Sequence, residues 1–164
     1  MTDPRRACPC GLPAAYDDCC GRFHGKVPRE PATPEALMRS RFSAFATANV
    51  DWLYRSLHPE HPDRGRSRSA FRRDLTRHFA TGVRYTRLEV VEAPSCTALD
   101  AGRVLFIAHG TVKGKDFLLA ELSTFCHDGT GWRYRDGQTI PESAIGRPEK
   151  RTTLAELQAR GIVV

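Results

Sequence analysis

Four cysteines lie within thirteen residues near the N-terminus, at positions Cys8, Cys10, Cys19 and Cys20. Thiolate sulfur is a preferred ligand of Zn²⁺, and a closed set of four protein ligands leaves no open position for a catalytic water. Disulfides are the alternative, but neighbouring cysteines form only strained bridges. The spacing therefore predicts a zinc site with a structural role, with these four residues as the ligands.

A second group of candidates lies on the run 116–126, whose alternation places one carboxylate among apolar neighbours. The residues on that face are Phe117, Leu119, Glu121, Ser123 and Phe125. Two interpretations follow for Glu121. It acts as a general base or ligand-binding group, with His109 or Tyr134 as an accessory donor, or it belongs to a buried ion pair that stabilises the fold. The structural interpretation is favoured, because no nucleophile with a nearby base, phosphate loop or second metal cluster supports an enzyme.

The elements that carry these residues change character along the chain. Helices are predicted over 34–48, 50–57 and 67–80, the first with Thr33 as its N-cap and Pro34 at its first position. Short β-rich runs follow at 83–93, 103–112, 116–126 and 131–138, with hairpin breaks at 100–102, 113–114 and 128–131. Helices followed by antiparallel strands indicate an α+β fold. A further short helix is expected near 152–160.

Composition restricts the setting and the partners. The chain has 164 residues, of which 40% are hydrophobic and 27% charged, and no apolar run is long enough to cross a bilayer. The N-terminal sequence has no secretory signal, so we expect a cytoplasmic protein, in which cysteines bind metal more often than they form disulfides. Residues 64–87 contain eight Arg and one Asp. This Arg stripe is interpreted as a solvated helix face, with nucleic-acid binding as the less favoured alternative.

The cysteine spacing, with Gly11 after the second cysteine and Tyr16 before the third, resembles the zinc motif at the C-terminus of the SecA translocase. Residues 35–45, 121–125 and 131–137 resemble signatures of the YchJ family of uncharacterised bacterial proteins. The resemblance implies a central domain like nuclear transport factor two, with three helices on a strongly curved antiparallel sheet that forms a cone. Many relatives carry a second zinc motif at the C-terminus, which this chain lacks.

The resemblance also suggests a partner for Glu121. The first helix is expected to cover the mouth of the cone, and it carries Arg41 on the same face as Leu37 and Phe45. Arg41 is therefore the predicted ion-pair partner, and Arg39 is the second candidate. The predicted pocket residues are Arg39, Arg41, His109, Glu121, Ser123 and Tyr134.

Three segments are predicted: a zinc knuckle with its linker (1–31), the cone (32–140) and a C-terminal extension (141–164). Residues 21–31 are interpreted as the linker, so that the zinc module folds separately. The expected function is that of a zinc-binding adaptor or binding module. Its knuckle contacts a protein or a ribosome-related partner, and its cone accepts a small ligand. The alternative is a small-molecule enzyme that uses Glu121.

Overall fold

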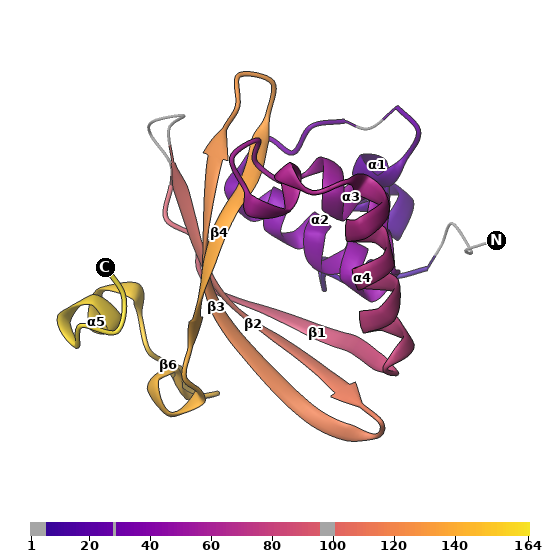
Figure 1. Ribbon diagram of the computed structural model, residues 1–164. Helices are drawn as coiled ribbons and strands as arrows, with labels where there is room; N and C mark the ends of the chain where they lie inside the picture. The colour runs from indigo at the N-terminus through magenta and orange to yellow at the C-terminus, as the bar shows by residue number, and fades with distance from the viewer. Residues whose placement is uncertain (1–5, 28, 96–100) are drawn as a thin grey trace.

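The computed structural model describes residues 6–27, 29–95 and 101–164. The helices of the first half of the chain lie on one face of a four-stranded antiparallel sheet, whose strands are adjacent in the order in which they follow along the chain (Figure 1). This arrangement confirms the α+β fold expected from the sequence. None of the helices in the described part of the chain is long and apolar enough to span a membrane.

Three helices cover the inner face of the sheet, namely α2 (Pro34–Ala46), α3 (Val50–Arg55) and α4 (Arg68–Ala80). Each begins at a polar side chain that accepts a hydrogen bond from a free backbone N–H of the first turn. Thr33 accepts from Ala36, and Asn49 and Ser67 cap the other two helices in the same way. These caps determine where each helix begins.

The sheet consists of long strands, with bounds β1 (Val83–Glu92), β2 (Gly102–Val112), β3 (Lys115–His127) and β4 (Trp132–Ile140). Lys113 and Gly114 join β2 to β3 with positive φ angles of 50° and 77°, the geometry of a tight hairpin turn. The register shifts at Tyr85/Arg87 and Val90/Glu92 in β1, and between β3 and β4 at Thr124/Phe125. Such bulges bend a sheet, and the strands curve around the helices in Figure 1.

The C-terminal extension covers the outer face of the sheet. It contains η3 (Glu142–Ala144), the short strands β5 (Gly146–Arg147) and β6 (Lys150–Arg151), and α5 (Leu154–Ala159). Leu157 is buried in a hydrophobic cluster with Leu105, Ile107 and Leu122 of the sheet. Arg151 pairs with Glu89 at 2.7 Å. The sheet is therefore covered on both faces, with the helices α2–α4 inside and the extension outside (Figure 1).

The segment interpreted as a linker is partly helical, which corrects that interpretation. After η1 (Tyr16–Asp18), α1 (Gly21–His24) buries Phe23 against Trp52, with ring centroids 6.3 Å apart. The cysteines share one hydrophobic cluster with α2 and α3. The three segment boundaries and the separate folding of residues 1–31 stay predictions, and this shared core is a physical argument against separate folding.

Candidate functional site

The four N-terminal cysteines converge on one point, as their spacing predicts. Each sulfur lies within 4.8 Å of every other one, and all four residues are buried. The Sγ atoms of Cys10 and Cys19 are 3.6 Å apart. A tetrahedral site with Zn–S bonds of about 2.3 Å has S–S edges of about 3.8 Å. The sulfurs can therefore hold a metal ion of this size after only small movements.

The electrostatics of the cluster favour a cation. Hydrogen bonding to the thiol of Cys10 lowers the pKa of Cys8. Burial raises the pKa of Cys19 to about 12, and hydrogen bonding to Cys10 raises the pKa of Cys20. Four thiols this close cannot all lose their protons unless a positive charge compensates them. The cluster can therefore hold a divalent metal.

Helix α2 joins the cysteine cluster to the cone. On the side of the cluster, Nη1 of Arg39 donates to the backbone oxygen of Cys10 at 3.0 Å. Nε2 of His24 lies 2.8 Å from the backbone oxygen of Ser40, and burial lowers the pKa of His24. Arg39 also pairs with Glu35 at 2.9 Å. It therefore faces the knuckle, and the prediction that it lines the cone is wrong. Its role is to attach the knuckle to the helix.

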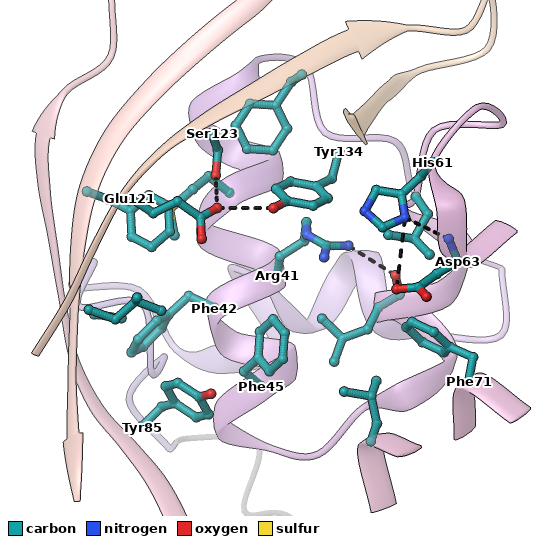
Figure 2. Close-up of a pocket in the computed structure, with 18 residues that line it drawn as sticks. Arg41, Phe42, Phe45, His61, Asp63, Phe71, Tyr85, Glu121, Ser123 and Tyr134 are labelled. Carbon is teal, nitrogen blue, oxygen red and sulfur yellow. Dashed lines mark hydrogen bonds and ion pairs between the residues drawn. The ribbon is translucent and has the colours of Figure 1, made fainter. Parts of the chain in front are cut away.

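The other side of α2 lines a cavity of about 310 Å³ inside the cone. Most of the wall is apolar and aromatic, and Figure 2 shows the rings around the space. The polar lining residues come from several elements: Arg41, His61, Asp63, Tyr85, Glu121, Ser123 and Tyr134. A largely apolar cavity with a few polar groups is typical of a small-molecule site.

Arg41 is a buried cation in this wall, with only 9% of its surface exposed. Its Nη1 donates to the backbone oxygen of Leu53 at 3.0 Å and to Oγ of Ser56 at 2.6 Å. Its Cζ lies 4.4 Å from the centroid of the Tyr134 ring, a cation–π contact. Burial lowers the pKa of Arg41 to about 10, so the guanidinium remains charged at neutral pH.

Glu121, Ser123 and Tyr134 meet on the sheet wall of the cavity. Ser123 donates to Oε1 of Glu121 at 2.7 Å, and the Tyr134 hydroxyl donates to the same oxygen at 3.1 Å (Figure 2). Gly137 lies opposite Ser123 on β4, and a Cβ at that position would be 2.0 Å from Oε1 of Glu121. A side chain there would displace the carboxylate. Burial raises the pKa of Tyr134, which therefore stays a donor.

The predicted ion pair between Arg41 and Glu121 is wrong in its geometry. Among the residues that the structure describes, no carboxylate lies within 4.0 Å of the Arg41 guanidinium. The Tyr134 side chain contacts both partners, with its ring on Arg41 and its hydroxyl on Glu121. The two charges therefore face the same cavity without touching.

His109 lies on the other face of the sheet, outside the cavity. Its neighbour Ala108 lines the cone, so alternation along β2 turns His109 outward. Its Nε2 lies 3.4 Å from Glu89 and 2.9 Å from Arg87. The proposed accessory donor is thus a component of a polar network on the outer face.

The structure adds two pocket residues that the sequence did not assign, His61 and Asp63. They lie in the segment 58–66, which contains the 3-10 helix η2 (Pro62–Gly65) and is attached to β4 by a hydrogen bond from the backbone N–H of His58 to the backbone oxygen of Tyr134. Burial lowers the pKa of His61, whose ring packs on Tyr134. A short segment without periodicity gives no sequence signal that its side chains line the cavity.

The other candidates have structural surroundings. In the Arg stripe, Arg68 and Arg72 both pair with Asp51, at 2.9 and 2.5 Å. Arg66 pairs with Asp63 and Asp74. Part of the stripe's charge is therefore neutralised locally. Cys126 lies on β3 away from the cluster, and Cys96 lies outside the described residues.

Comparison with known proteins supplies the family. Residues 33–137 match the family described as YchJ, middle NTF2-like domain. The chain belongs to this YchJ-like family. The UPF0225 protein SCO1677 of Streptomyces coelicolor is 39% identical over 138 residues, covering 84% of this chain and 98% of the relative. The UPF0225 protein Reut_A0143 of Cupriavidus pinatubonensis is 36% identical over 143 residues, with coverages of 84% and 91%.

Two solved structures share the fold of this YchJ-like chain. RPA3114, a SEC-C motif containing protein from Rhodopseudomonas palustris, has a TM-score of 0.67 and 30% identity. The match covers 82% of this chain and 98% of that protein. A SEC-C motif containing protein from Psychrobacter arcticus has a TM-score of 0.63 and 20% identity, with 96% of each chain covered. The resemblance to the YchJ family and to the SecA C-terminal (SEC-C) motif is thereby confirmed.

Proposed function

We propose that this protein is a cytoplasmic binding module that holds a small organic ligand in its cone and is stabilised by a structural zinc ion. The observation that carries the proposal is the cavity of about 310 Å³ behind α2. Its volume is at the small end of the roughly 300–1,000 Å³ common among ligand sites. A compact ligand with an apolar body suits it.

The metal's proposed role is to hold α2 in place. All four zinc positions would be filled by cysteine, so the ion would shape the chain and leave no site for substrate. The N-terminal segment contacts α2 through Arg39 and Ser40, while Met38, Phe42 and Phe45 of the same helix line the cavity. A metal-bound knuckle would therefore fix the position of α2, and with it the cavity wall that this helix forms.

The contacts of Glu121 suit a binding site. Both donors near it, Ser123 and Tyr134, engage the same oxygen. In this geometry the carboxylate orients two hydroxyl groups at the wall of the cavity. A contact of the knuckle with a protein or a ribosome-related partner remains compatible with this role, because the knuckle lies on the opposite side of α2.

A pair of substitutions on neighbouring residues tests the proposal. Leu119 lines the cavity, while Leu118 packs on the outer face of the same strand. We expect Leu119→Phe to fill part of the cavity and Leu118→Phe to leave it open. Thermal shifts would be measured with a library of neutral and charged small compounds, next to native mass spectrometry of protein purified gently from its own cells.

The wild type and Leu118→Phe should share a set of stabilising compounds that Leu119→Phe does not bind. If no compound shows this pattern and no small molecule accompanies the native protein, the binding role is wrong.

A further inference from the structure

We propose that the cone selects a monocarboxylate with a compact apolar body, and that Arg41 binds the carboxylate. This inference rests on the proposed ligand-binding function and names the chemical class of the ligand. It follows from which donors of Arg41 the protein uses and which it leaves available.

The protein occupies one end of the guanidinium. Both hydrogen bonds, to Leu53 and Ser56, come from Nη1, and the Tyr134 ring lies against the face of the group. Nε and Nη2 make no hydrogen bond to any residue in the described ranges. Both keep accessible surface, because the only buried unpartnered side-chain nitrogen or oxygen there is Nε of Arg55.

The two remaining donors have a geometry of their own. The N–H groups of Nε and Nη2 point the same way from a planar group, and such a fork matches the two oxygens of a carboxylate. Arg41 lines the cavity, and its surroundings already hold the group at Nη1 and at its face. Little side-chain freedom is therefore lost when an anion binds.

The charges around the cavity limit an anionic ligand to a single negative charge, placed at Arg41. Among the described lining residues, Arg41 is the only Lys or Arg. Of the two lining carboxylates, Asp63 pairs with Arg66 at 3.1 Å, whereas Glu121 accepts, in the described part of the chain, only from the neutral hydroxyls of Ser123 and Tyr134 and keeps its negative charge. A phosphate dianion would need more positive charge than one guanidinium provides, so a carboxylate fits better.

The apolar residues of the cavity wall indicate the shape of the ligand's apolar body. Five phenylalanines line the same cavity, namely Phe42, Phe45, Phe71, Phe106 and Phe125. Aromatic walls favour flat or branched apolar groups, which they contact over large areas. The ligand class is therefore an aromatic or alicyclic acid with one carboxylate.

The test compares acids with their uncharged amides. The probes are 3-phenylpropanoate and cyclohexylacetate, with 3-phenylpropanamide and cyclohexylacetamide as matched neutral compounds. Affinities are measured by calorimetry on the full zinc-loaded chain, for the wild type, Arg41→Gln and Arg77→Gln. Arg77 lies on α4 with a side chain that is 73% exposed, so its substitution removes the same charge away from the cavity.

We expect the wild type and Arg77→Gln to bind each acid at least about tenfold more tightly than its amide, the scale of a charge-assisted hydrogen bond. In Arg41→Gln this ratio should fall to about one. If Arg41→Gln does not fold, ¹⁵N spectra of the arginine guanidinium groups in the wild type replace it. The Arg41 signals should then shift with the acids and stay in place with the amides.

Equal binding of acids and amides would overturn the inference while leaving a ligand-binding cone. An acid preference that survives in Arg41→Gln would overturn it too, because the charge would be recognised elsewhere. If neither acid binds, the inference is also wrong, and the Leu118 and Leu119 variants then decide whether the cone binds ligands of another class.

Discussion

Replacing Tyr134 by Phe tests the arrangement that separates Arg41 from Glu121. The substitution removes the hydroxyl that donates to Oε1 of Glu121 at 3.1 Å and keeps the ring that lies on Arg41. Hydrogen bonds to charged groups contribute about 1.5–3 kcal/mol. Glu121 is only half-buried and keeps its bond from Ser123, so we expect a loss near the lower end, about 1.5 kcal/mol.

A double-mutant cycle measured by urea unfolding isolates this bond. Glu121→Met removes the acceptor at similar volume, and its coupling with Tyr134→Phe should be about 1.5 kcal/mol. The control is Tyr85→Phe, whose hydroxyl bonds to His78 at 3.0 Å, and its effect should add to that of Glu121→Met within about 0.5 kcal/mol. Additive effects for Tyr134 and Glu121 would refute the assigned geometry.

A double-mutant cycle also tests whether Arg41 and Glu121 form a direct ion pair. Breaking a buried pair in contact costs about 3–5 kcal/mol, and restoring neutrality recovers part of it. Because Arg41 and Glu121 do not touch, we expect their coupling to fall well below about 3 kcal/mol. A coupling of that size would show that the two side chains pair directly in solution.

Three further outcomes are expected. The native protein should contain one Zn²⁺ per chain, and metal analysis should show its loss in the double variant Cys19→Ser, Cys20→Ser; retention would disprove the ligand set. Phe23→Ala should lower the free energy of unfolding by about 3 kcal/mol, and an unchanged urea midpoint would show that the knuckle does not pack on Trp52. Burial lowers the pKa of His24 below 6.5. The contribution of His24 to stability is therefore complete above pH 6.5 and is lost as the pH falls toward the folded-state pKa. A ¹⁵N titration that gives a pKa of 6.5 or more would contradict this.

The sequence predicts most of the fold because local signals and the global structure agree. Thr33 and Pro34 define the start of α2, and the pair Lys113-Gly114 defines the hairpin between β2 and β3. Strand alternation correctly places Glu121 and Ser123 on the inner face. Each of these signals depends on a few residues that are neighbours in the sequence, so it can be recognised without knowledge of tertiary contacts.

The errors concern contacts between distant segments. The sequence indicates a linker at α1 because this helix has only four residues, begins at Gly21 and is followed by Gly25, so it shows no periodicity. Burial of Phe23 on Trp52 stabilises the helix. The sequence predicts Glu121 as the partner of Arg41, but the side chain of Tyr134, 93 positions away from Arg41, contacts both residues and separates their charges. The prediction that His109 faces the cone is wrong, because its neighbour Ala108 faces inward. Parity along β2 could have corrected this last assignment.

The most direct measurement is a crystal structure of the zinc-loaded protein grown with 3-phenylpropanoate. We expect the phenyl ring among the aromatic residues of the cone and both carboxylate oxygens within hydrogen-bonding distance of Nε and Nη2 of Arg41. A ligand bound on the outer surface, or one inside the cone with its carboxylate away from Arg41, would contradict this expectation.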